Sequence, residues 1–282
     1  MIRKLLLILI LFPWRSGAQI LPNIQEHALA MPAGVIIDGK ANELNNTFQA
    51  YNKGTYLSYT LSHDNNYFYL VVQSSNLGIN NKILSCGITF MVNPEGKKNE
   101  KGAPAITFPA ITKSYLSDKM KVMRSMPSIV VNDDEALKVK DKSMQRQGEP
   151  AVSRRDSLIV QRHKRELSNI KEIGITNLKG IDKTLLSIYN DLDIKAKIAI
   201  DGQNRLTYEL RVPLKYFNVA AQAESQVAYQ LILNDSSAMY GGNIPKLVIQ
   251  SDEKKTYPGI GGLDIRMADA KIGFWGTYPL TH

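Results

Sequence analysis

The sequence predicts an all-β fold: a two-sheet antiparallel β-sandwich of the jelly-roll or immunoglobulin-like type, with a basic insertion. Three observations predict it. Apolar and polar residues alternate in several short segments, as they do in strands with one buried face. Turn residues such as Asp-Gly separate these segments. Helical patterns are few, and the clearest ones lie between residues 113 and 168, where we expect a partly helical or mobile insertion.

The N-terminus has the pattern of a secretory signal peptide. Two basic residues precede an unbroken apolar run over residues 5–12, and Ser16-Gly17-Ala18 fits a cleavage site. The run is shorter than the roughly 20 residues of a membrane span. We therefore expect an exported protein, periplasmic or extracellular, that is cleaved after Ala18. Residues 19–282 then form a single domain, and no transmembrane span is expected.

The first predicted hairpin is followed by one more strand. Segments 55–62 and 67–73 alternate on either side of a polar turn, and residues of one parity in each segment form a buried face. These residues are Leu57, Tyr59, Leu61, Phe68, Leu70 and Val72. A strand over residues 85–93 follows, with Cys86 on its inner side. Because an exported chain with one cysteine forms no internal disulfide, stability must come from the core.

The second predicted hairpin joins residues 194–201 to residues 205–214 through an Asp-Gly turn. In its second strand Leu210 falls on the apolar face, whereas Glu209 and Arg211 fall on a face expected to be solvated. Two further strands are expected over residues 228–234 and 270–278.

The positive charge is concentrated in one segment. The chain has a net charge of +9, and residues 113–168 hold 13 Lys and Arg against 8 Asp and Glu. A nucleic-acid-binding protein would spread such charge over its folded surface, so no nucleic-acid partner is expected. The segment is either a solvated insertion or a patch for acidic partners.

The opening "VIIDGKANEL" (residues 35–44), the polar hairpin turn and the strand "YFYLVVQ" resemble the family-nine carbohydrate-binding modules and their DOMON-like relatives. The segment "RLTYELRVPLKYF" (residues 205–217) is similar to a late strand of that family. The resemblance implies an exported β-sandwich that binds glycans and is often attached to an enzyme. The chain departs from the family at Leu44, where those domains often have Trp.

The resemblance directs attention to aromatic residues, because sugar C–H faces pack on flat rings. The candidate ligand contacts are Tyr56, Tyr67, Tyr69 and Trp275, the last being the single Trp after the signal peptide. The tyrosines also fit a purely structural role as cross-strand pairs. Asp38 and Glu43 are either turn residues or residues that bind calcium or form a polar rim, and no other cofactor is expected.

No catalytic motif is found. The four His lack metal-ligand spacing, and no Gly-x-Ser-x-Gly sequence occurs. We therefore expect a non-catalytic glycan-binding module. One alternative is an envelope or surface domain that binds another protein and has lost sugar binding. A third is a hydrolase, or a protein associated with one, whose paired carboxylates are far apart in the chain.

Overall fold

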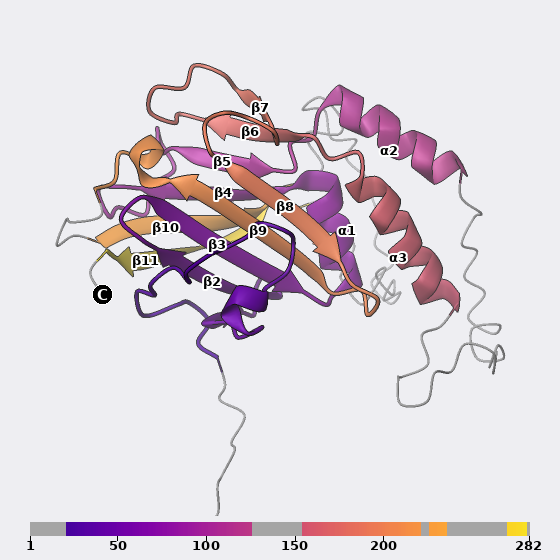
Figure 1. Cartoon of the computed structure of the whole chain (residues 1–282), viewed down its shortest axis with the longest axis horizontal. Helices are drawn as coiled ribbons and strands as arrows, with labels where there is room; N and C mark the ends of the chain where they lie inside the picture. Colours follow the sequence, from indigo (N-terminus) through magenta and orange to yellow (C-terminus); the bar gives the residue numbers. More distant parts are fainter. Residues whose placement is uncertain (1–20, 126–153, 221–225, 236–269, 281–282) are drawn as a thin grey trace, which may run out of the picture.

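The computed structural model describes residues 21–125, 154–220, 226–235 and 270–280. Two antiparallel sheets pack face to face (Figure 1), which confirms the predicted two-sheet β-sandwich. The signal peptide with its cleavage site lies outside the described residues, as does the central part of the insertion, residues 126–153.

One sheet has five strands in the order β1-β2-β3-β9-β8. Their bounds are β1 (Ala50–Asn52), β2 (Leu57–His63), β3 (Tyr67–Ser74), β8 (Lys195–Ile200) and β9 (Leu206–Pro213). The other has six in the order β11-β10-β4-β5-β6-β7. These are β4 (Ile88–Asn93), β5 (Ala105–Phe108), β6 (Glu172–Thr176), β7 (Leu185–Ser187), β10 (Gln226–Leu233) and β11 (Ile272–Pro279). Both predicted hairpins are present, and they pair with each other through β3 and β9.

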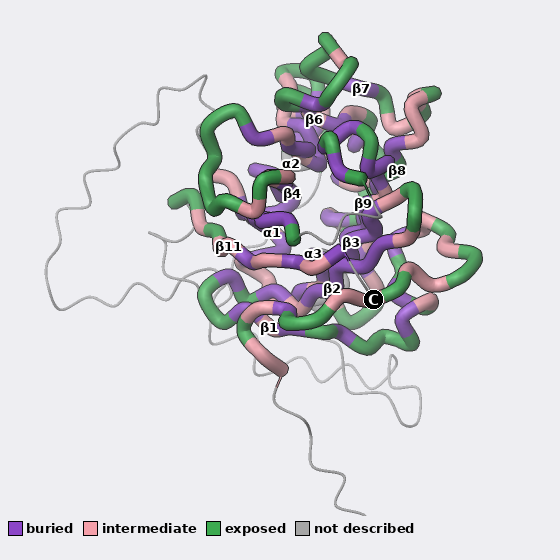
Figure 2. The backbone as a smooth tube through the Cα atoms, turned by 90° about the vertical axis from the view of Figure 1, so that its left-hand side faces the viewer, coloured by how far each residue is buried: buried purple, intermediate pink, exposed green. Residues whose placement is uncertain are grey.

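The main core fills the space between the sheets, where Figure 2 shows the buried backbone positions. It contains every residue that the first hairpin was predicted to bury, and Leu210 is fully buried as expected. Phe68, Phe90 and Phe217 contact one another edge to face at centroid distances of 5.7 to 6.2 Å. Such aromatic pairs add stability beyond their buried area.

Helix α1 (Leu77–Cys86) was not predicted from the sequence. The Asn76 side chain caps it by accepting a hydrogen bond from the Ile79 N–H, 3.1 Å away. Ile79 and Ile83, one turn apart, bury their side chains in the main core. The assignment of Cys86 to a strand was therefore wrong, since this buried residue ends the helix and the strand begins at Ile88.

A second, smaller core lies on the outer face of the five-stranded sheet. The N-terminal segment from Leu21 to Phe48, which includes the short 3₁₀ helix η1 (Asn42–Leu44), crosses this face and packs apolar residues against Tyr69 and Val71. Leu44 contributes to this core. The face expected to be solvated is therefore largely covered, and Glu209 within it is fully buried.

Glu209 anchors this segment and explains the opening Asp-Gly sequence. Its Oε2 accepts hydrogen bonds from the backbone N–H groups of Asp38, Gly39 and Lys40, and its Oε1 accepts one from the Tyr69 hydroxyl. Gly39 has φ +87°, and a Cβ there would lie 2.5 Å from the Cβ of Ala199. Only glycine fits a turn that approaches β8 so closely.

The described ends of the basic insertion form helices α2 (Lys113–Ser125) and α3 (Arg154–Leu167). They lie with α1 at one end of the sandwich, on the right in Figure 1. Tyr115, Lys119, His163 and Glu166 are buried there. The expectation of a solvated insertion is therefore corrected for these helices, because their inner faces pack against the body of the protein and share hydrogen bonds with it.

Candidate functional site

A cavity of about 330 Å³ opens at the end of the sandwich opposite the three helices. Three separate segments line it: the β2–β3 turn, the residues before β8, and the 3₁₀ helix η3 (Leu214–Phe217) that follows β9. The lining residues are Asn65, Asn66, Tyr67, Asp191, Leu192, Asp193, Pro213, Leu214, Lys215, Tyr216, Val219 and Ala220. The volume falls within the roughly 300–1,000 Å³ of small-molecule sites.

Tyr67 and Asp193 form the polar centre of this cavity. The Tyr67 hydroxyl donates a hydrogen bond to Asp193 Oδ2 at 2.6 Å. Arg211 donates from Nη2 to the other oxygen of the same carboxylate at 2.7 Å, and its guanidinium lies 4.9 Å from the centroid of the Tyr67 ring. The carboxylate therefore holds the hydroxyl end of Tyr67, and the cation lies over its ring.

These contacts also determine the protonation of the two groups. The hydrogen bond to Asp193, together with partial burial, raises the pKa of Tyr67. Burial alone would raise the pKa of Asp193, but the hydrogen bonds from Tyr67 and Arg211 outweigh it and lower that pKa below its ordinary value. At neutral pH the pair is therefore a neutral phenol and a carboxylate, and the carboxylate is already satisfied by protein donors.

The backbone around Tyr67 is held in place. Asp64 Oδ1 accepts hydrogen bonds from the N–H groups of Asn66 and Tyr67, both at 2.7 Å. The Asn66 carbonyl accepts one from Leu214 N–H at 2.8 Å, which ties the hairpin turn to η3. A site built from such braced turns is formed before a ligand arrives, which lowers the entropy cost of binding.

The remaining lining offers polar groups that no described residue contacts, whereas the Tyr216 ring is buried in the main core. Lys215 places its Nζ 5.0 Å from the ring centroid of Tyr216. The side chains of Asn65, Asn66 and Asp191 are exposed and form no hydrogen bond or ion pair with the described residues. The Tyr67 ring beside free amides and a carboxylate suits a ligand with apolar C–H faces and many hydroxyl groups.

The structure does not bring the four predicted aromatic contacts together. Tyr67 lines the cavity, whereas Tyr69 is fully buried beside Glu209 and offers no surface ring. Tyr56 is 40% exposed but precedes β2, so it lies at the opposite end of the hairpin from Tyr67. Trp275 is in the edge strand β11 and packs on Met91, Ala103 and Ala105 on the outer face of the other sheet.

Asp38 and Glu43 both act as turn residues. Asp38 Oδ1 accepts a hydrogen bond from Lys40 N–H at 2.9 Å, and Glu43 Oε1 accepts one from Ile36 N–H at 3.3 Å. Among the described residues, no group of three or more His, Cys, Asp or Glu is arranged to hold a metal ion. The geometry therefore gives the calcium-binding interpretation of these two residues no support.

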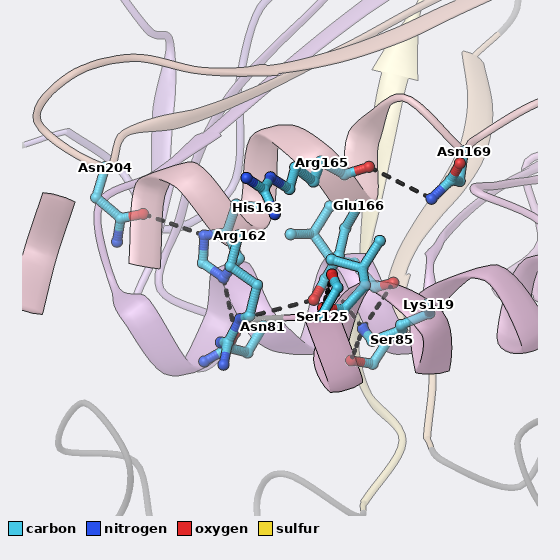
Figure 3. A network of polar contacts seen from close by, with 12 residues as sticks. Asn81, Ser85, Lys119, Ser125, Arg162, His163, Arg165, Glu166, Asn169 and Asn204 are labelled. Carbon is cyan, nitrogen blue, oxygen red and sulfur yellow. Dashed lines mark hydrogen bonds and ion pairs between the residues drawn. The ribbon is translucent and has the colours of Figure 1, made fainter. Parts of the chain in front are cut away.

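A second polar cluster lies between the helices (Figure 3), and its contacts are mainly structural. The His163 ring, fully buried, lies between Asn81 Oδ1 at 2.8 Å and Asn204 Oδ1 at 3.3 Å. Burial, assisted by neighbouring Arg162 and Lys119, lowers the pKa of His163 to about 4. Lys119 Nζ in turn lies 3.3 Å from Glu166 Oε2. The cluster joins α3 to α1, α2 and the β8–β9 turn.

Tyr67 was predicted from the sequence as a candidate contact, whereas the other groups of the cavity were not. Asp191 and Asp193 belong to the stretch "YNDLD" that precedes β8, and Tyr216 follows Pro213 in "PLKYF". Both stretches are polar or aromatic residues directly next to a predicted strand, and this is the signal that marks loop sites at one end of a sandwich. Their meeting with Tyr67 depends on the pairing of β3, β8 and β9.

No protein-family model matches this sequence, and no curated protein matches it. No helix in the described part of the chain is long and apolar enough to cross a membrane. The resemblance to family-nine carbohydrate-binding modules therefore stays a prediction.

Proposed function

We propose that this chain is an exported, non-catalytic glycan-binding protein and that the Tyr67 cavity holds a sugar unit. The observation that carries the proposal is the braced tyrosine beside unoccupied polar side chains. A sugar presents an apolar C–H face, which packs on an aromatic ring, and hydroxyl groups, which bond to amides and carboxylates. The resemblance of the opening segment and of the late strand to glycan-binding modules supports the same function.

Each group has a distinct role in the proposed complex. Tyr67 supplies the stacking surface, with its orientation fixed by Asp193 and Arg211. Asp191, exposed at the cavity wall, accepts hydrogen bonds from sugar hydroxyls. Asn65 and Asn66 each provide a donor and an acceptor.

The test is the retention of the mature chain on immobilised neutral polysaccharides, followed by calorimetric titration with the matching monosaccharide and oligosaccharides. We expect Tyr67→Ala to weaken binding by about tenfold or more, which corresponds to at least about 1.4 kcal/mol. Asp191→Ala should also weaken binding. Its side chain has no partner among the described residues, so this variant should fold like the wild type.

Tyr56→Ala is the matched control, since it removes an exposed tyrosine at the other end of the same hairpin. It should bind like the wild type. The proposal is wrong if no polysaccharide of a panel of β-glucans, xylans, mannans and α-glucans retains the protein. It is equally wrong if Tyr67→Ala and Asp191→Ala, shown by circular dichroism to be folded, bind as tightly as the control.

A further inference from the structure

A second cavity of about 570 Å³ adjoins the first. It is formed by the loop after β6, by β7, and by the residues that lead from β7 to β8. Asp191 and Leu192 line both cavities, so the two share a wall. The rest of its lining is Gly180, Ile181, Asp182, Lys183, Leu185, Leu186, Ser187, Tyr189 and Asn190.

Tyr189 is the prominent feature of this second cavity. Its side chain is 82% exposed, more than any other large hydrophobic residue in the described part of the chain, and Leu185 in the same cavity is 42% exposed. No aromatic or cation–π contact of Tyr189 is found among the described residues. An exposed ring of this size contributes little to folding, because it removes almost no apolar surface from water.

The backbone that carries Tyr189 is nevertheless firmly held. Tyr189 N–H donates to Ser187 Oγ at 3.1 Å. The Asn190 side chain donates to the carbonyls of Ser187 and Ile194, both at 2.8 Å, and accepts from the N–H groups of Leu192 and Ile194. A fixed loop thus presents a free ring to solvent. A ring on a loop held in this way needs little further ordering when a ligand binds.

Polar groups around the ring indicate the kind of ligand. The carboxylates of Asp182 and Asp191 are exposed and have no hydrogen-bond or ion-pair partner within the described ranges. They are ready to accept hydrogen bonds from hydroxyl groups. The exposed Lys183 also lines this cavity, so two carboxylates and one ammonium group leave a small negative charge, which suits a neutral ligand better than an anionic one. A stacking ring, an exposed leucine and free carboxylates together suit a second neutral sugar.

We propose that the two cavities are adjacent subsites of one site, and that the ligand is a neutral oligosaccharide of two or more sugar units. Tyr189 stacks on the unit outside the Tyr67 cavity, and Asp191, in the shared wall, contacts both units. This inference rests on the proposed function and makes it more specific: the protein distinguishes a sugar chain from a single sugar by means of a second ring 122 positions along the sequence from the first.

The test compares the affinity for one to four units within the cello-, xylo- and manno-oligosaccharide series, measured by calorimetry on the wild type, Tyr189→Ala, Tyr189→Phe and the control Tyr56→Ala. In the series that binds, the wild type should gain about tenfold or more in affinity beyond one unit. Tyr189→Ala should lose that gain and keep the wild-type affinity for the monosaccharide. Tyr189→Phe should retain it, since the ring remains.

Other outcomes would overturn the inference. An affinity that is independent of chain length, or a gain that survives in Tyr189→Ala, would show that the second cavity is not a subsite while the proposed function stands. Preference for oligomers of uronic acids over neutral ones would contradict the assigned ligand class. If none of these series binds, and malto-oligosaccharides do not bind either, the proposed function fails, and this inference fails with it.

Discussion

Replacement of Glu209 tests how the N-terminal segment is attached to the sheet. The side chain is fully buried and accepts hydrogen bonds from three consecutive backbone N–H groups and from Tyr69. Glu209→Ala leaves the Gly39 N–H and the Tyr69 hydroxyl buried without this acceptor. Each such group costs about 1–3 kcal/mol, so the free energy of unfolding should fall by about 2–6 kcal/mol. The other two N–H groups are partly exposed, and water replaces the lost bond.

Glu209→Gln separates the loss of hydrogen bonds from the loss of charge. The amide oxygen still accepts from the backbone, and the amide nitrogen donates to the Tyr69 hydroxyl oxygen. We expect a loss below about 2 kcal/mol for this variant. Lys197→Ala is the control, because Lys197 lies directly opposite Glu209 in the β8–β9 ladder but is exposed. Its loss should be below about 0.5 kcal/mol.

Urea denaturation measures these losses, and hydrogen exchange shows where they arise. In Glu209→Ala, amides of residues 21–48 should exchange faster, while those of β4 and β10, which belong to the other sheet, change little. The reasoning is refuted if Glu209→Ala loses no more stability than Lys197→Ala. It is also refuted if Glu209→Ala and Glu209→Gln lose equally, since the hydrogen bonds would then not be the cause.

Three further variants test buried polar groups. The pKa of His163 is about 4 in the folded state, against 6.5 for an ordinary His. The buried neutral ring therefore contributes up to about 3 kcal/mol to the free energy of unfolding. This contribution is complete above pH 6.5 and is lost as the pH falls toward 4. His163→Gln should flatten the pH dependence of urea midpoints in this window, and an unchanged dependence would contradict the assignment. The hydroxyl of Tyr208 is buried without a hydrogen-bond partner in the described structure, so Tyr208→Phe should leave the free energy of unfolding unchanged or raise it by about 1 kcal/mol. The comparison is Tyr59→Phe, which removes a hydroxyl that is hydrogen-bonded to Gln25 and Tyr229. Its free energy of unfolding should fall by about 1–2 kcal/mol. The prediction is wrong if urea denaturation shows Tyr208→Phe to be less stable than Tyr59→Phe.

The strands could be predicted from the sequence because alternation is a local property. Successive side chains in a strand point to opposite faces, so the pattern in residues 57–73 and 194–214 determines which residues share the core face. The Asp-Gly link between residues 194–201 and 205–214 likewise identified a hairpin. Helix α1 was missed because its buried residues merge with the apolar strand that follows, and short apolar runs do not distinguish the two structures.

One residue of the candidate site, Tyr67, could also be predicted from local sequence. Tyr67 follows a polar turn, and the sequence places its ring on the face opposite the core. Its partners were not predictable, since Asp193 is 126 positions away and reaches Tyr67 only because β9 lies between β3 and β8. Tyr189 does not belong to any alternating apolar pattern, so the sequence does not single it out. It is recognised as a candidate contact only because the structure shows an exposed ring on a loop held by hydrogen bonds.

What the sequence determined by itself is therefore the set of strands and the residues on each face. Only the tertiary structure decided what covers each face. Glu209 has the polar neighbours of a solvated strand face, yet it is buried because a segment 170 positions earlier folds across it and directs backbone N–H groups at its carboxylate. Alternation specifies the side of a sheet on which a residue lies, whereas burial depends on contacts between distant parts of the chain, which no local pattern encodes.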